Sequence, residues 1–551
     1  MSPGGTRPLV TNMTVPLQET PVIEGDRSVH GTLAWPLESA ARSHGARTAV
    51  IEGERRLSYS ELHNRVRRIG SGLAQAGIAQ GAVVAVLLAN SLEHLECWLA
   101  VPAYGRVLTT LNTRLTVPEL AFMLEDSGAE ILIVDTANLE AGRRLRDLVP
   151  SLEHLLFVDD GTCPDDCRPY ESLMAAHGVA PPDLDPDSLA VIMYTGGTTG
   201  RPKGVMLSHS NLLSNCKHVW HQDGLQREDV VLHGPPFFHM AGAQMIHAVT
   251  WVGGSHVLLP RFTPAGYAHA ITEHQATVGF LVPTMIHMLL DHLDDHPADV
   301  HGLRLLHYGA SPMSAKQLRR AAQTLGCEFV QGYGMTEASP GVTFLSAQDH
   351  RRALSGETPE RLNSVGYALP GVQLEVRDAS GRPVADDTVG EVWVRGPNIM
   401  LGYLNRAEET SHALVDGWYR TGDGGYCDAD GYLFLVDRIK DMIITGGENV
   451  YSIEVERVLD THPAVAEAAV IGVPDDRWGE RVHAVVVTEA GADVTEADLI
   501  EHCRKHIAHY KAPRSVELRT EPLPKSGAGK ILKHHLRKSA RTQQPPASAR
   551  L

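Results

Sequence analysis

The sequence has little cysteine, few aromatic residues and a deficit of positive charge. Seven cysteines are scattered over 551 residues, and aromatic residues make up 5% of the chain. An odd number of cysteines without a dense framework suits a reducing compartment. Lys and Arg number 49 against 66 Asp and Glu, which gives a formal net charge of −17. Nucleic acids and membrane surfaces attract basic faces, so this charge argues against a general binder of either.

Cys163 and Cys167, in CPDDC, form the only close cysteine pair. A metal site would need two more ligands at suitable spacing, and the neighbouring sequence supplies none. We therefore expect two thiols in a polar loop.

Long apolar runs are also missing. The first twenty residues, MSPGGTRPLVTNMTVPLQET, contain no apolar core of signal-peptide length, and no stretch approaches the length of a membrane span. We therefore expect a cytoplasmic protein without a membrane span.

What is present is the pattern of a large α/β protein. The segment LSYSELHNRVRRIGSGLAQAG predicts an amphipathic helix, with a capping box at Ser58 and Glu61 and a C-cap at Gly77. Short, continuously apolar runs alternate with helical segments, which indicates largely parallel sheets covered on both faces. The predicted buried strands are 83–90, 131–135, 154–159, 189–195, 256–260, 303–309 and 328–334.

The pattern changes after about residue 365. VQLEVRD, GEVWVRG and GYLFLVD are short alternating strands separated by Gly and Asp turns, which predicts a β-rich subdomain. From residue 437 the order helix, strand, loop, strand predicts a compact α+β domain. The chain ends in RTQQPPASARL, a polar and Pro-rich segment that predicts disorder.

The loop YTGGTTGRPKG, residues 194–204, directly follows a buried strand. Glycine-rich backbone can turn its N–H groups inward to bind an anion, and threonine hydroxyls and a lysine strengthen such a site. The spacing does not fit the Walker-type phosphate loop or the dinucleotide fingerprint. A flexible surface turn is the alternative, but the composition favours a phosphate site.

This loop resembles the phosphate loop of the adenylate-forming (AMP-binding) superfamily, which includes acyl- and aryl-CoA synthetases, carrier-protein adenylation domains and luciferases. QGYGMTEAS, GWYRTGD, DRIKDMIITGGENVYSIEVE and LPKSGAGKILK resemble later motifs of that family, in the same order. Gly196 departs from the pattern, because a serine is usual there. The likeness extends from about residue 30 to 540.

The resemblance implies an α/β multidomain fold. The large N-terminal domain would hold two α/β sheet subdomains and a small β-barrel-like one, and the C-terminal domain would be mobile. The implied boundaries are an arm at 1–25, an adenylation domain at 26–436 with its β-rich part at 365–436, a mobile domain at 437–540 and a tail at 541–551.

The resemblance also implies an ATP-dependent ligase that joins a fatty or aryl monocarboxylic acid to AMP, releases pyrophosphate and transfers the acyl group to coenzyme A. Mg²⁺ would accompany ATP. The alternative is an adenylating enzyme that delivers the acid to a carrier protein or another nucleophile. An oxygenase of luciferase type and a nucleotide sensor without activity are further alternatives, and a homodimer is left open.

The resemblance also implies roles for single residues. Glu337 would hold Mg²⁺ and Thr336 would touch the α-phosphate. Asp423 would accept both ribose hydroxyls, with Arg438 as a second contact, and Lys530 would reach the substrate carboxylate and the α-phosphate. Taken alone, Glu337 also fits a helix N-terminal acid and Asp423 a turn aspartate. The remaining nucleotide contacts would be Thr195, Gly196, Gly197, Thr198, Thr199, Gly200 and Lys203 at the phosphates, and Gly309, Ala310, Ser311 and Tyr333 at adenine.

For the second half-reaction, Lys440 would be the hinge between the domains, and Gly446 and Gly447 would line the pantetheine tunnel. Trp478 and Lys511 resemble contacts to the CoA nucleotide, although each fits a surface role equally well. His239 would gate the acyl pocket. The acyl channel would be lined by Met245, Phe280, Gly332, Gly334, Ser339 and Pro340.

Overall fold

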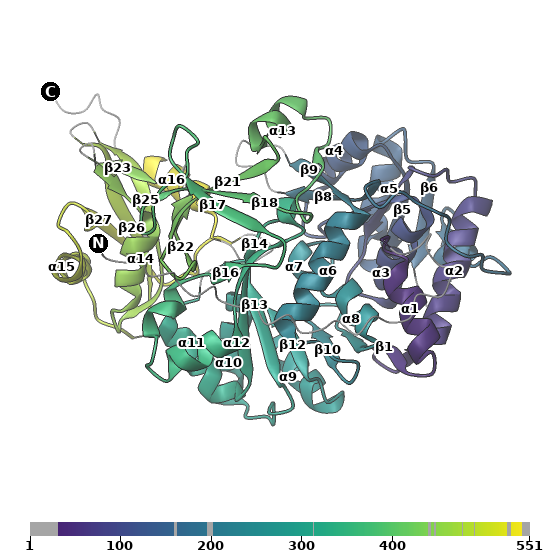
Figure 1. The fold of residues 1–551 in the computed structure, drawn as a ribbon, viewed down its shortest axis with the longest axis horizontal. Coiled ribbons are helices and arrows are strands. Elements are labelled where there is room, and N and C mark those ends of the chain that lie inside the picture. Colours follow the sequence, from purple (N-terminus) through teal and green to yellow (C-terminus); the bar gives the residue numbers. More distant parts are fainter. Residues whose placement is uncertain are drawn as a thin grey trace, which may run out of the picture.

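The computed structural model describes residues 31–158, 162–195, 202–311, 313–438, 442–445, 448–475, 478–489, 491–525 and 531–542. Over these ranges the chain forms four β-sheets with helices packed against them (Figure 1). The first sheet has the order β16 (Tyr367–Ala368), β15 (Gly341–Leu345), β14 (Glu328–Gly334), β13 (Leu305–Gly309), β12 (Val278–Leu281), β10 (Val230–His233), β11 (Ser255–Leu258), β1 (Thr48–Glu52) and β2 (Arg55–Ser58).

The second sheet has the order β19 (Gly402–Tyr403), β9 (Lys203–Ser208), β8 (Leu189–Thr195), β4 (Val107–Thr110), β3 (Val83–Leu87), β5 (Ala129–Asp135), β6 (His154–Val158) and β7 (Arg168–Pro169). Both large sheets are parallel in the middle, and antiparallel pairs occur toward their ends. The prediction of largely parallel sheets is confirmed.

Helices cover both faces of each large sheet, which explains the continuously apolar strands. One core joins the facing sides of the two sheets to α1 (Trp35–His44), α2 (Tyr59–Gln75), α3 (Leu92–Ala100), α6 (His209–Asp223), α7 (Met240–Ala243) and α8 (Ile246–Val252). The far face of the first sheet packs against α9 (Pro264–Glu273), α10 (Pro283–Asp295), α11 (Ala315–Leu325) and α12 (Ala347–Leu354). The far face of the second sheet packs against α4 (Val117–Ser127) and α5 (Leu139–Leu148).

Two smaller sheets follow along the chain, and Figure 1 shows the last one at the opposite end of the molecule from α1 and α2. The third sheet contains β17 (Gln373–Arg377), β18 (Gly390–Arg395), β21 (Trp418–Cys427), β20 (Leu414–Val415) and β22 (Leu433–Arg438), with α13 (Ala407–Ala413) beside it. The fourth contains β24 (Glu448–Val450), β23 (Ile443–Thr445), β26 (Gly479–Thr488), β25 (Val465–Asp475) and β27 (Ser515–Arg519), with α14 (Ser452–Asp460), α15 (Glu496–His506) and α16 (Lys533–Thr542). Short 3-10 helices are η1 (Pro102–Tyr104), η2 (Thr136–Asn138), η3 (Tyr170–Leu173), η4 (Thr336–Ala338) and η5 (Pro359–Asn363).

The start of α2 matches its sequence signal and its end differs by one residue. Ser58 is the N-cap, and its reciprocal capping box with Glu61 is formed. The C-cap is Ala76, so the prediction of Gly77 as C-cap was wrong. Gly77 comes directly after it with φ 83°, a left-handed conformation that a residue without a β-carbon adopts most easily.

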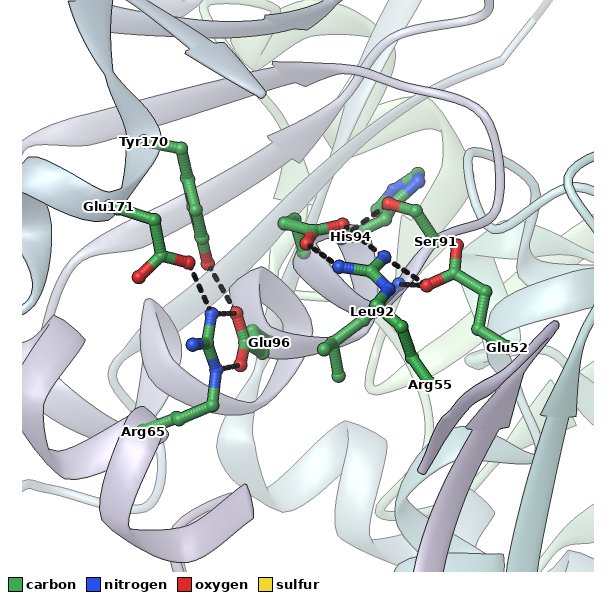
Figure 2. Close-up of polar contacts among 10 residues, drawn as sticks. Glu52, Arg55, Arg65, Ser91, Leu92, His94, Glu96, Tyr170 and Glu171 are labelled. Carbon is green, nitrogen blue, oxygen red and sulfur yellow. Dashed lines mark hydrogen bonds and ion pairs between the residues drawn. The ribbon is translucent and has the colours of Figure 1, made fainter. Parts of the chain in front are cut away.

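The acidic side chain of Glu96 anchors α3 to its neighbours (Figure 2). Glu96 accepts hydrogen bonds from the Arg65 guanidinium and from the Tyr170 hydroxyl, the latter at 3.0 Å. Arg65 also pairs with Glu171 at 2.7 Å. Burial raises the pKa of the Glu96 carboxyl to about 7, although Arg65 opposes the shift. These contacts connect α2, α3 and η3 through the fully buried carboxylate of Glu96.

Within the part of the chain that the structure describes, no helix has the length and apolar character needed to cross a membrane.

Candidate active site

The predicted nucleotide contacts Tyr333 and Asp423 meet where the first and third sheets adjoin. Tyr333 lies on β14, and its hydroxyl donates a hydrogen bond to Asp423 Oδ2 at 2.7 Å. Asp423 lies on β21, is only 7% exposed, and its amide donates to Thr421 Oγ1 at 3.0 Å. In the β21–β22 ladder Asp423 stands opposite Arg438. The fold therefore brings the predicted adenine and ribose contacts together, although Tyr333 and Asp423 are 90 residues apart in the sequence.

Glu337, the predicted metal ligand, lies in η4 directly after Thr336. Its Oε1 accepts a hydrogen bond from the Tyr403 hydroxyl at 2.9 Å, and its backbone carbonyl accepts one from the Met400 amide at 2.9 Å. The ammonium of Lys203 lies 5.0 Å from the centre of the Tyr403 ring. Tyr403 thus connects the predicted metal ligand with the lysine of the predicted phosphate loop.

The predicted phosphate loop connects two paired strands. β8 and β9 are antiparallel, and Thr195 stands opposite Lys203 at the open end of the pair. The remaining loop contacts lie outside the described residues, as do the predicted hinge, tunnel and C-terminal lysine contacts. These residues are Gly196, Gly197, Thr198, Thr199, Gly200, Lys440, Gly446, Gly447 and Lys530.

The backbone after β14 folds into a tight turn beside Glu337. The Ser339–Pro340 peptide is cis, and the Met335 amide donates to the Pro340 carbonyl at 2.9 Å. A β-carbon on Gly334 would stand 1.7 Å from that carbonyl oxygen, so only glycine fits there. Asn398, fully buried, donates to the carbonyls of Ala338 and Gly341 at 3.0 and 2.7 Å.

The predicted adenine edge comes at the end of β13. Gly309 pairs with Gly332 of β14, and a β-carbon on Gly309 would stand 2.5 Å from the Gly332 carbonyl oxygen. Ala310 has φ 68° and is exposed, and Ser311 is partly exposed. Gly309 and Gly332 therefore let two predicted substrate-binding segments approach closely.

His239, the predicted gate, is the N-cap residue of α7 and its ring lies against Phe238, with centroids 4.8 Å apart. Nε2 is covered and has no hydrogen-bond partner among the described residues. Burial, and then the charge of Arg114, lower the pKa of the imidazole to about 4. The ring is therefore uncharged at neutral pH.

Two of the residues predicted to line the acyl channel belong to the core between the two large sheets. Met245 and Phe280 are 1% and 4% exposed and belong to this core, whereas Gly332 and Gly334 are partly exposed. Ser339 is fully buried, and its hydroxyl has no hydrogen-bond partner among the described residues.

The predicted CoA contacts lie in the fourth-sheet region, and both have local partners. Lys511 forms an ion pair with Glu454, with Nζ 2.7 Å from Oε1. The Arg514 guanidinium lies 4.4 Å from the centre of the Trp478 ring. To bind a phosphate, Lys511 would have to leave its ion pair with Glu454 or bind both groups at once.

Sequence reasoning missed Tyr403 and Asn398. Both lie in PNIMLGYLN, which carries no charged or nucleophilic residue and has the pattern of an ordinary short strand. Their roles depend on contacts with residues at least 57 positions away, which local patterns do not reveal.

Comparison with known proteins identifies the family. A family model described as AMP-binding enzyme matches residues 37–404, and one described as AMP-binding enzyme C-terminal domain matches residues 454–530. The chain belongs to the AMP-binding enzymes. The resemblance seen in the sequence motifs is confirmed.

Relatives of this AMP-binding enzyme align over almost their whole length. A feruloyl-CoA synthase from Amycolatopsis sp is 41% identical over 92% of this chain and 99% of the relative. A long-chain-fatty-acid–CoA ligase from Thermus thermophilus is 37% identical over 91% of this chain and 94% of the relative. The crystal structure of ATP-bound MatB from Rhodopseudomonas palustris is 31% identical, covers 93% of this chain and 99% of its own, and superposes with a TM-score of 0.83. The predicted α/β multidomain fold is confirmed.

Proposed function

We propose that this AMP-binding enzyme activates an aryl acid and transfers it to coenzyme A. The chain is an ATP-dependent acid–CoA ligase, because CoA ligases align with at least 90% of it and both AMP-binding regions are present. The observation that carries the choice of acid is the 41% identity to a feruloyl-CoA synthase over 92% of this chain. These relatives do not favour delivery to a carrier protein.

A carboxylate becomes an electrophile once it is joined to the α-phosphate of ATP, because AMP can then leave. Bringing the anionic acid to a polyanion requires positive charge and oriented donors more than a general base. Asp423, held by Tyr333, is suited to accept two ribose hydroxyls. Lys203 would neutralise phosphate charge, and Lys530 would bring the acid and the α-phosphate together.

Glu337 fits a Mg²⁺ ligand. Its carboxylate is partly exposed and Tyr403 fixes one of its oxygens, so it presents a hard, oriented oxygen donor. Mg²⁺ usually retains water and phosphate ligands and needs only one or two carboxylates. A bound ion would offset phosphate charge, and Tyr403 would orient the carboxylate beside Lys203.

The cellular setting is also part of the proposal. All seven cysteines lie in the described part of the chain and are free thiols, which suits the reducing cytoplasm where ATP and CoA are available. A measurement of the molecular mass in solution tests whether the protein is a homodimer. Thioester assays with a panel of carrier proteins test whether one of them accepts the acyl group.

The test is ATP–pyrophosphate exchange over a panel of aryl and fatty acids, followed by thioester formation with CoA. We expect exchange and thioester formation with aryl acids, and weaker activity with fatty acids of matched length. Exchange without thioester would overturn CoA as acceptor, and a preference for fatty acids would overturn the choice of acid.

A further inference from the structure

A buried histidine–aspartate pair lies beside the predicted acyl channel and has no part in the steps above. His307 lies on β13 and Asp223 is the last residue of α6. Their side chains are 2% and 0% exposed, and His307 Nδ1 is 3.0 Å from Asp223 Oδ2. Gln222 Nε2 is also near, at 3.2 Å from Nδ1.

The position of Asp223 lowers the stability of the fold, so stability does not explain this residue. A negative charge at a helix C-terminus opposes the helix dipole, and burial of a carboxylate is costly unless it is well paired. Asp223 Oδ1 has no hydrogen-bond partner among the described residues. Arg304 covers the end of α6 by donating to the carbonyls of Asp223 and Gly224, but its ion pair is with Asp229.

Apolar residues lie beside His307 on both neighbouring strands. Phe280 on β12 stands opposite His307 in the sheet, and their rings are 4.9 Å apart edge to face. Val330, opposite His307 on β14, is fully buried in the same core. The histidine is therefore a polar group among apolar side chains of β12 and β14, with Asp223 and Gln222 near its Nδ1.

The Nε2 edge of the ring lies next to the backbone of Gly332. A β-carbon on Gly332 would stand 2.8 Å from His307 Nε2, so a side chain at position 332 would crowd this edge and glycine does not. Gly332 is partly exposed and precedes Tyr333, the predicted adenine contact. With Nδ1–H donating to the Asp223 carboxylate, the neutral form of the imidazole has its lone pair at Nε2.

We infer that His307 determines specificity by accepting a hydrogen bond from a ring hydroxyl of the aryl acid, with Asp223 as its positioning residue. The inference rests on the proposed function, since the hydroxyl belongs to the acid that is activated. A fatty acyl chain offers no donor and would leave Nε2 unmatched in an apolar wall. A site that hydrogen-bonds a substrate hydroxyl rejects the analogue without it far more strongly than an apolar pocket does.

The test compares thioester formation from 3- and 4-hydroxycinnamate with that from the corresponding methylcinnamates, which have a similar shape and no donor. For wild type we expect kcat/KM to be at least about tenfold higher for one of the hydroxylated acids than for its methyl analogue. In His307→Leu this ratio should fall to about one, while unsubstituted cinnamate is still converted. Tyr308→Phe is the matched control, because Tyr308 is the next residue and hydrogen-bonds His350 on the opposite face of the sheet.

Asp223→Asn provides a second variant of nearly unchanged volume, in case His307→Leu does not fold. It should lower the same ratio, because the amide no longer fixes the imidazole tautomer. A wild-type ratio near one, or a ratio that both variants leave unchanged, overturns the inference while the proposed function stands. No thioester from any acid with wild type would overturn the proposed function, and this inference with it.

Discussion

Two acidic side chains, Glu96 and Glu337, are held in different ways. Glu96 is fully buried and accepts from the Arg65 guanidinium and from Tyr170. Glu337 is partly exposed, accepts from the Tyr403 hydroxyl, and no ion pair to it is found in the described ranges. A guanidinium neutralises and covers a carboxylate, whereas a tyrosine hydroxyl orients it and leaves its charge in place. The difference separates an acid that supports the fold from one suited to bind a ligand.

Arg65→Leu should have the largest effect on stability. Removing one partner of a buried pair leaves an uncompensated carboxyl, which costs about 3 kcal/mol of unfolding free energy. Urea unfolding measures this loss. The matched control Arg352→Leu, which breaks the exposed pair with Glu357, should change little. Equal effects of both substitutions would show that Glu96 is not a structural anchor.

Glu337→Gln should act on activity and not on stability. Losing the carboxylate should lower the adenylation rate by about 10²–10³-fold, the usual effect of removing one electrostatic contact from a transition state. ATP–pyrophosphate exchange at increasing Mg²⁺ measures it, and the concentration of Mg²⁺ needed should rise. An unchanged Mg²⁺ requirement would argue against Glu337 as the metal ligand.

Tyr403→Phe should have a smaller effect on the same step. The variant loses one hydrogen bond to Glu337 and keeps the ring under Lys203, so adenylation should fall about tenfold. Tyr426→Phe, in the same sheet as Asp423 and stacked on Phe434, is the control and should leave the exchange rate unchanged. A similar loss of exchange rate in both variants would show that Tyr403 acts through packing and not through its hydrogen bond to Glu337.

The pH dependence of stability tests the role of Glu96 without removing its partner Arg65. Burial raises the pKa of folded Glu96 to about 7 from its ordinary value of 4.5. The folded state therefore binds more protons than the unfolded state between these values, and the contribution of Glu96 to stability falls as pH rises through this window. Wild type should lose more stability than Glu96→Gln between pH 4.5 and 7. Parallel curves of unfolding free energy against pH for the two proteins would contradict a raised pKa of Glu96.

The local parts of this account could be predicted from the sequence. The capping box at Ser58, the buried strand before the phosphate loop and the alternating strands after residue 365 each depend on neighbouring residues. The contacts of Asp423 with Tyr333 and of Glu337 with Tyr403 join distant segments. Motifs indicated Asp423, Tyr333 and Glu337 one by one, and missed Tyr403. The His307–Asp223 pair was missed for the same reason, because neither residue belongs to a recognisable motif.

The most direct test of the central claim separates the two half-reactions in wild type and Lys530→Ala. Wild type should exchange pyrophosphate into ATP with an aryl acid, and yield AMP and thioester in equal amounts when CoA is added. Lys530→Ala should lose exchange by about 10²–10³-fold, yet convert supplied aryl-adenylate to thioester at the wild-type rate. Formation of ADP by wild type, or equal loss of both half-reactions in the variant, would contradict the account.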